Sequence, residues 1–202
     1  NAKFKIFENQ IEKDVAVINK NIVMNRPIRA KRLYFSIKEY LREGAFYKDG
    51  FMYVRLDGKE YVYSREISPL MGAHNTENIL SCLIVSHIIG VDKAVVEDTL
   101  KTFKGLPHRV EFVRDIDGIT FINDSKATNV DATKRALGSI MGNVILIAGG
   151  KDKGGSYREI ASEMKKVKAL FLIGEAKEKI EKELGVYTKV YKEKDLKDAV
   201  IK

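Results

Sequence analysis

The sequence predicts an α/β protein in two parts, with a mainly parallel sheet in the second part. After residue 105, apolar strand-like runs alternate with helical patterns at a short spacing, which is typical of a parallel sheet with helices on its faces. Before that point, Asp49-Gly50 and Asp57-Gly58 separate aromatic and β-branched runs, which favours an antiparallel meander. Two helical patterns follow this meander.

In the first part, residues 1–104, apolar residues recur at helical spacing after residue 72. Asn75 or Thr76 is expected to cap the first helix, and Gly90 to end it. The expected segments are strands at 14–19 and 33–37, a meander at 45–67, and helices within 72–90 and 92–103.

The second part, residues 105–202, starts at a break in the helical period, where Gly105 and Pro107 indicate a domain boundary and a hinge at 104–108. Strands and helices alternate after a hairpin that turns at Asp117-Gly118. The expected segments are hairpin strands at 110–116 and 119–123, helices at 129–140, 158–167, 175–185 and from 195, and strands at 143–150, 169–174 and 188–192.

The composition is that of a globular protein with a charged surface. Hydrophobic residues make up 45% and charged residues 32% of the 202 residues, with a net charge of +8. The basic residues are dispersed, so we expect no nucleic-acid partner. No apolar run reaches eighteen residues, so no membrane span is expected. Cys82 stands alone, which favours a reducing cytoplasm. The missing initial Met and a helical pattern broken off at the end lead us to expect a fragment lacking both ends.

Two strand-to-helix loops carry unusual chemistry: residues 123–129, called the polar loop, and residues 149–156, called the glycine loop. Ligands of parallel sheets bind beyond the carboxyl ends of the strands. If both loops follow strands of one parallel sheet, Lys126, Lys151 and Lys153 converge on one cleft.

The polar loop suits an anion, because a helix N-terminus presents free N–H groups and a partial positive charge. Lys126 adds a full charge, Ser125 and Thr128 add hydroxyl groups, and Asp124 suits a sugar hydroxyl or a metal-bound water. The alternative is that Asp124, Ser125 and Asn129 only cap the helix, which leaves Lys126 and Thr128 unexplained.

The glycine loop can bring backbone close to an anion, with a lysine as point charge; alternatively it is a flexible loop with solvated lysines. Neither a Walker loop nor a G-x-G-x-x-G motif is present, so a nucleoside triphosphate would need phosphate-binding residues from outside this sequence. Arg109 can bind phosphate from the hinge or lie free on the surface. Asn75 and Asn78 can read an adenine edge or belong to a helix start. His87 falls on an apolar stripe and is expected to be a core residue.

The segments GAHNTENIL, GLPHRVEFV, FINDSKATNVDATKRAL and ILIAGGKDKGG occur in this order. In this set the sequence resembles the Mur ligases, and within them the D-glutamate-adding branch. The resemblance covers nearly the whole chain. It implies the second half of a central ATP-binding domain in residues 1–104 and an incomplete Rossmann-like ligase domain in residues 105–202. It also implies ATP-dependent addition of D-glutamate to UDP-N-acetylmuramoyl-L-alanine through an acyl phosphate, in a monomer with Mg²⁺ as cofactor.

The resemblance also implies roles for single residues. Arg109 and Lys126 would be catalytic and bind nucleotide phosphate, and Asp124 would bind the ribose. Asn75 and Asn78 would bind ATP. Lys3 would be a carbamylated lysine that binds Mg²⁺. The D-glutamate site would contain Ser125, Thr128 and Lys153.

The sequence lacks the family's UDP-binding domain, its phosphate-binding loop, the metal-binding Glu and His of the central domain, and the last C-terminal segment. We therefore expect activity in the intact enzyme and not in this chain alone. Three alternatives stay open: another Mur ligase or a folylpolyglutamate synthetase, a basic nucleic-acid module, and a non-catalytic regulator that keeps the amino-acid pocket.

Overall fold

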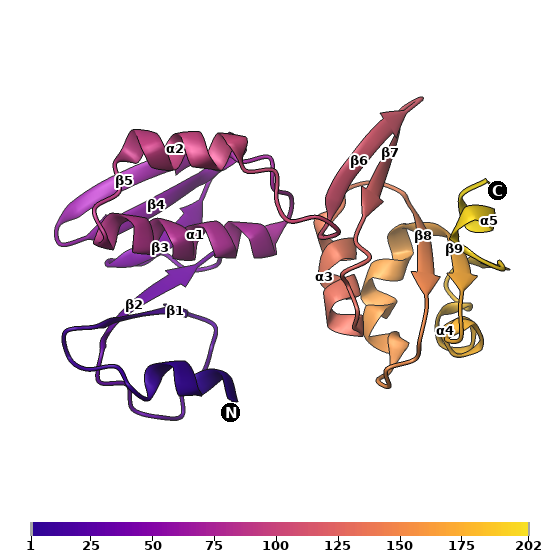
Figure 1. Ribbon diagram of the computed structural model, residues 1–202, viewed down its shortest axis with the longest axis horizontal. Coiled ribbons are helices and arrows are strands. Elements are labelled where there is room, and N and C mark those ends of the chain that lie inside the picture. The colour runs from indigo at the N-terminus through magenta and orange to yellow at the C-terminus, as the bar shows by residue number, and fades with distance from the viewer. Residues whose placement is uncertain (1, 202) are drawn as a thin grey trace. The chain divides into compact units, whose positions relative to one another are not determined.

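The chain divides into two compact units, Asn1–Lys104 and Gly105–Lys202, and the division falls in the Gly- and Pro-containing segment. The computed structural model describes residues 2–201, and the side chains of residues 4–201 (Figure 1). No helix among these residues is long and apolar enough to cross a membrane. The identity of each unit as part of a particular ligase domain stays a prediction.

The first unit is built on a five-stranded sheet in the order β1-β2-β3-β4-β5, in which β1, β2 and β3 pair in parallel and the remaining pairs are antiparallel. The antiparallel meander expected at 45–67 is therefore confirmed. Its elements are η1 (Ala2–Phe7), β1 (Val15–Asn19), β2 (Lys31–Ser36), β3 (Gly44–Lys48), β4 (Phe51–Leu56), β5 (Lys59–Ser64), η2 (Arg65–Ile67), α1 (Ala73–Ile88) and α2 (Lys93–Thr102).

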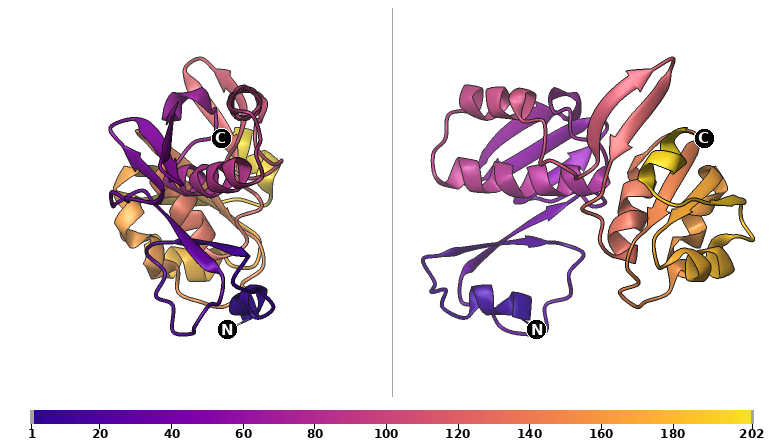
Figure 2. Two further views of the ribbon diagram at one scale, coloured as in Figure 1. Left: turned by 90° about the vertical axis from the view of Figure 1, so that its left-hand side faces the viewer. Right: turned by 45° about the vertical axis from the view of Figure 1, so that its right-hand side comes forward.

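The main core of the first unit lies between this sheet and the two helices (Figures 1 and 2). Alternate residues of β4 are buried, as the period of two requires for one covered face. They meet the apolar stripe of α1, where Leu80 and Ile84 have no exposed surface. A smaller cluster is formed by Ala16, Ile18, Ile28 and Ala30.

The second unit contains a three-stranded parallel sheet in the order β10-β9-β8 and a separate antiparallel hairpin, β6-β7. The predicted α/β fold with a parallel sheet is thus confirmed. The segment expected as a helix at 158–167 is a 3-10 helix. The elements are β6 (Glu111–Ile116), β7 (Ile119–Asn123), α3 (Val130–Ser139), β8 (Val144–Gly149), η3 (Tyr157–Lys166), β9 (Val167–Ile173), α4 (Lys177–Leu184), β10 (Lys189–Lys192) and α5 (Leu196–Ile201).

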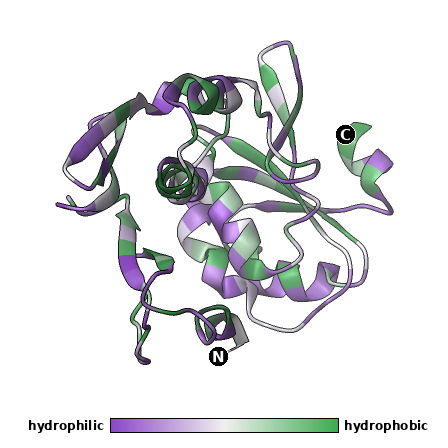
Figure 3. Cartoon of the chain, turned by 60° about the vertical axis from the view of Figure 1, so that its left-hand side comes forward, coloured by the Kyte–Doolittle hydropathy of each residue, from purple (hydrophilic) through white to green (hydrophobic). Residues whose placement is uncertain are grey.

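The core of the second unit joins the parallel sheet to one face of its helices. Figure 3 shows hydrophobic and hydrophilic residues mixed along the helices. The buried residues of α3, η3 and α4 are all apolar: Ala136, Leu137, Ile160, Met164, Ile180 and Leu184. Met164, Leu170 and Leu172 have no exposed surface, and Leu137 of α3 and Leu184 of α4 are nearly as buried. Val130, the first residue of α3, and Ala176, directly before α4, pack against the same core, so the starts of both helices are held to the body of the unit.

Candidate functional site

The polar loop is joined by hydrogen bonds to the start of the second unit. Asp124 Oδ1 accepts from the backbone N–H of Val110 at 3.0 Å, and the backbone N–H of Lys126 donates to the carbonyl of His108 at 3.0 Å. Asn123 adds a contact of 2.8 Å between its amide nitrogen and His108 Nδ1. These bonds hold Arg109, which lies between His108 and Val110, beside the polar loop.

The backbone on both sides of Arg109 is strained. His108 has φ +64° and Val110 has φ +45°, in the left-handed region that non-glycine residues rarely adopt and that is least favourable for a β-branched residue. Such residues cost roughly 1–3 kcal/mol each and persist where the surrounding structure holds them. Here the bonds to Asp124 and Lys126 do so, which makes this segment a candidate functional site.

One expectation about the polar loop is wrong, and the alternative reading of the loop as a helix cap alone also fails. β7, which leads into it, pairs only with β6, so the polar loop does not follow a strand of the parallel sheet, and Ile119 and Phe121 on that strand are exposed. Capping alone does not explain the loop either. Only Asn129 caps α3, with its Oδ1 accepting from the backbone N–H of Ala132 at 2.8 Å.

The candidate ligand groups of the second unit are open to solvent. Lys126, Ser125, Thr128 and Arg109 are exposed and Asp124 is half-buried. Lys153 and Lys151 of the glycine loop are also exposed. Within the described part of the chain the structure records no hydrogen bond or ion pair for the ammonium groups of Lys126, Lys151 or Lys153, which leaves these cations available to a ligand.

The glycine loop adjoins the start of α3 by a route that the sequence did not indicate. A Cβ placed on Gly155 would lie 3.9 Å from Val130 Cγ2, in ordinary van der Waals contact. Val130 is the first residue of α3, directly after the polar loop. The two loops therefore neighbour each other through this contact and not through a shared sheet edge. Convergence of Lys126 and Lys153 on one ligand stays a prediction.

The root of the glycine loop lies very close to the end of β9. The backbone N–H of Gly150 donates to the carbonyl of Ile173 at 3.0 Å, and that of Ala176 donates to the carbonyl of Gly150 at 3.0 Å. A Cβ on Gly149 would lie 1.8 Å from the carbonyl oxygen of Ile173, so only glycine fits there. The glycine loop thus leaves the sheet at its carboxyl edge, where ligands of parallel sheets bind.

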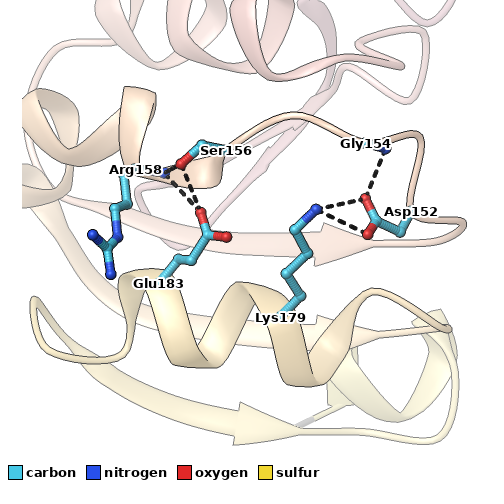
Figure 4. A network of polar contacts seen from close by, with 6 residues as sticks. All are labelled: Asp152, Gly154, Ser156, Arg158, Lys179 and Glu183. Carbon is cyan, nitrogen blue, oxygen red and sulfur yellow. Dashed lines mark hydrogen bonds and ion pairs between the residues drawn. The ribbon is translucent and has the colours of Figure 1, made fainter.

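Two residues of α4, missed at the sequence level, hold the glycine loop (Figure 4). Lys179 Nζ lies 3.0 and 3.3 Å from the two carboxylate oxygens of Asp152. Glu183 Oε2 accepts from Ser156 Oγ at 3.0 Å and from the backbone N–H of Arg158 at 3.2 Å. The only available signal was the four-residue spacing of the two charges on a predicted helix, which puts them on one face.

These contacts shift the pKa values of the three charged groups. The hydrogen bond from Lys179, with one from the backbone N–H of Gly154, lowers the pKa of Asp152. The hydrogen bond to Asp152 raises the pKa of Lys179. Burial acts to raise the pKa of Glu183, but the hydrogen bonds from Ser156 and from backbone N–H groups outweigh it and lower that pKa. All three groups are therefore stabilised in their charged forms.

In the first unit, Asn75 and Asn78 lie near the start of α1, three residues apart, and are linked to each other. Asn78 Nδ2 donates to Asn75 Oδ1 at 3.4 Å, and Asn75 Nδ2 donates to the carbonyl of Met71 at 2.8 Å. The helix begins after Gly72, so the expectation that Asn75 or Thr76 caps it is wrong. Asn78 is exposed and keeps its amide partly available for a ligand.

Arg65 holds the segment that leads into α1. Its guanidinium donates to Thr76 Oγ1 at 2.7 Å, to the carbonyl of Ser68 at 3.2 Å, and to the carbonyl of Leu70. Burial lowers the pKa of Arg65 from its usual range.

His87, expected in the core, is half-buried. Its Nε2 lies 2.8 Å from the hydroxyl of Tyr63, and its ring stacks on Tyr61 with centroids 3.7 Å apart.

The side chain of Lys3 lies outside the described side chains. Among the described residues, no group of three or more His, Cys, Asp or Glu is arranged to hold a metal ion.

Comparison with known proteins identifies relatives of both units. Residues 108–202 match the family described as "Mur ligase, glutamate ligase domain". The UDP-N-acetylmuramoylalanine–D-glutamate ligase of Geotalea daltonii is 41% identical over 204 aligned residues, which cover 98% of this chain and 45% of that protein. The ligase of the same name from Caldanaerobacter subterraneus is 40% identical, covering 97% and 44%. The chain spans just under half the length of these curated relatives.

Solved structures resemble the chain in fold. A crystal structure of MurF from Acinetobacter baumannii has a TM-score of 0.71 at 15% identity and covers 99% of this chain and 47% of that one. The MurF ligase of Thermotoga maritima, solved in complex with ADP, has a TM-score of 0.61 at 16% identity, covering 95% and 52%. At such low identity these similarities concern the fold alone.

Proposed function

Because this chain belongs to the Mur ligase family, we propose that it is part of the ligase that joins D-glutamate to UDP-N-acetylmuramoyl-L-alanine in peptidoglycan precursor synthesis. The observation that carries the proposal is the identity of about 40% to D-glutamate ligases across nearly the whole chain. Since the chain spans 45% of the first of these relatives, the activity is proposed for the complete gene product.

In the proposed reaction, the γ-phosphoryl group of ATP passes to the carboxylate of UDP-N-acetylmuramoyl-L-alanine, giving an acyl phosphate and ADP. The amine of D-glutamate then attacks the acyl carbon. The tetrahedral intermediate collapses to the amide as inorganic phosphate leaves and the amine loses a proton. Charge develops first on the phosphoryl oxygens and then on the acyl oxygen, so fixed cations lower both barriers.

The geometry of the second unit supports a role for each candidate residue. Lys126 and Arg109 are exposed cations. The backbone hydrogen bond from Lys126 to His108, the neighbour of Arg109, holds the two chain segments together. They would bind phosphate oxygens. Asp124 keeps one carboxylate oxygen for a ribose hydroxyl, since its other oxygen accepts from Val110.

The neighbouring hydroxyls of Ser125 and Thr128, with Lys153 from the adjoining glycine loop, would bind the carboxylates of D-glutamate. In the first unit, Asn75 and Asn78 would bind ATP.

Mg²⁺ is part of the proposal through the family resemblance, as is carbamylation of Lys3. When bound, Mg²⁺ would neutralise phosphate charge. Among the described residues, no group of three or more His, Cys, Asp or Glu is arranged to hold this ion. A cytoplasmic location and a monomeric state complete the proposal.

The test is an amino-acid competition assay on the complete gene product with ATP and UDP-N-acetylmuramoyl-L-alanine, in which D-glutamate competes with L-glutamate. The reaction is measured by the release of inorganic phosphate. We expect activity with D-glutamate only. Activity restricted to L-glutamate with folate, or to another amino acid with a different UDP-linked acceptor, would overturn the assignment.

Substituting Lys126→Ala should lower kcat by roughly 100- to 1,000-fold, as loss of a single transition-state donor does. Lys165→Ala, on an exposed lysine of the same unit, is the matched control.

A further inference from the structure

The glycine loop is held at two points by one helix face. Lys179 and Glu183 lie one turn apart on α4, so both side chains project from the same side toward the loop (Figure 4). Lys179 binds the middle of the loop through Asp152, and Glu183 binds its end through Ser156. The root is fixed separately by the backbone bonds of Gly150.

The contacts of Asp152 orient the backbone at Lys153. Asp152 Oδ1 accepts from the backbone N–H of Gly154 at 3.0 Å, which closes a tight turn with Lys153 between the two bonded residues. The ammonium of Lys179 holds the same carboxylate by two contacts, so the turn is attached to α4. Lys153 itself is exposed. The turn therefore orients the Lys153 backbone while leaving its side chain available.

Lys179 and Glu183, with their contacts to Asp152 and Ser156, are called the clamp. The composition of the glycine loop makes such a clamp necessary. Gly154 and Gly155 have φ +79° and +91°, and nothing but the Val130 side chain lies within 4 Å of a Cβ placed on either. Glycine has the largest conformational freedom of any residue, so a free loop of this sequence would sample many directions for Lys153. A cation that must be ordered during binding contributes less to affinity than one already in place.

We propose that Lys179 and Glu183 are positioning residues that hold the glycine loop so that Lys153 meets a carboxylate of the amino-acid substrate. This inference rests on the substrate role proposed above for Lys153. Neither residue contacts the substrate; each acts through the loop. The clamp therefore tunes the affinity for the amino acid, and not for ATP or for the acceptor carboxylate.

The test measures KM for D-glutamate and for ATP, together with kcat, in variants of the complete gene product. Lys179→Met and Glu183→Ala should each raise KM for D-glutamate about 3- to 10-fold, since each loosens one point of a site that is still present. KM for ATP should stay within about twofold. Lys179→Arg and Glu183→Gln keep a donor and an acceptor, and should restore most of the affinity.

Lys182→Met is the matched control, because Lys182 is an exposed lysine on the same helix. It should leave both KM values unchanged. Thermal midpoints of all variants identify any that fail to fold. Because Lys179 and Glu183 are substituted separately, a folded variant of either residue that has lost its contact then carries the comparison. Lys153→Met measures the proposed substrate role independently and should raise KM for D-glutamate more than any clamp variant.

The outcomes separate the two ideas. If Lys153→Met raises KM for D-glutamate but the clamp variants do not, the clamp is only structural and the inference is wrong. The same holds if the clamp variants raise KM for ATP equally, or if Lys179→Arg fails to restore affinity. If Lys153→Met changes nothing, the substrate role proposed for Lys153 fails first.

Discussion

Gly149→Ala tests the close approach at the root of the glycine loop. The added Cβ would lie 1.8 Å from the carbonyl oxygen of Ile173 and 2.8 Å from its carbon, so β8 or β9 must move. Such a movement of β8 or β9 breaks the hydrogen bond of 3.0 Å between Gly150 and Ile173, and it weakens the bond between Ala176 and Gly150. Two bonds at about 1 kcal/mol each, added to roughly 1–3 kcal/mol for a positive φ, give a loss of about 3–5 kcal/mol.

Gly150→Ala is the matched control, because Gly150 also has a positive φ, +98°, but has nothing within 4 Å of an added Cβ. It should cost only the backbone strain, roughly 1–3 kcal/mol. The difference of about 2 kcal/mol corresponds to a separation in Tm of roughly 8–16 °C for a unit of about 100 residues.

The assay is urea and thermal unfolding of this chain followed by far-UV circular dichroism. The transition of the first unit should not move, so it serves as an internal reference. Equal destabilisation by Gly149→Ala and Gly150→Ala would show that β8 and β9 do not approach as described, and the reasoning about the loop root would be refuted.

Other perturbations test further contacts. Asn129→Ala should cost about 1 kcal/mol of unfolding free energy through loss of the α3 cap, whereas Ser125→Ala should cost almost nothing; equal losses in urea titrations would contradict the capping assignment. Arg65→Met should cost about 2–3 kcal/mol, since it removes charged donors from buried partners; an unchanged urea midpoint would count against that network. Burial, aided by Lys93, lowers the pKa of His87 in the folded state. On acidification, His87 is therefore protonated at a higher pH in the unfolded state than in the folded state. Stability of the first unit should therefore fall as pH drops from about 6.5 through the lowered pKa, and His87→Asn should remove this dependence; a slope unchanged by the substitution would contradict it.

Local pattern was sufficient for most elements of this protein. The strand–helix alternation predicts the parallel sheet of the second unit, because buried strands and amphipathic helices carry their periods in the sequence. The turns at Asp49-Gly50 and Asp57-Gly58 predict the meander, since positive φ is read from residue type, and both aspartates have it. The start of α1 was misplaced because its cap is Gly72, which offers no side-chain signal.

The sequence by itself determined which residues are chemically able to act: Lys126 and Asp124 at the polar loop, and Lys153 in the glycine loop. Only the tertiary structure decided how they are held. β7 pairs with β6 in a separate hairpin and is not a strand of the parallel sheet. The polar loop and the glycine loop therefore neighbour each other through Val130 and Gly155, and not through a common sheet edge. Lys179 and Glu183 reach the glycine loop from a helix more than twenty residues along the chain. Residue type sets what a side chain can bind, but contacts between distant segments depend on how the elements pack, which no local pattern encodes.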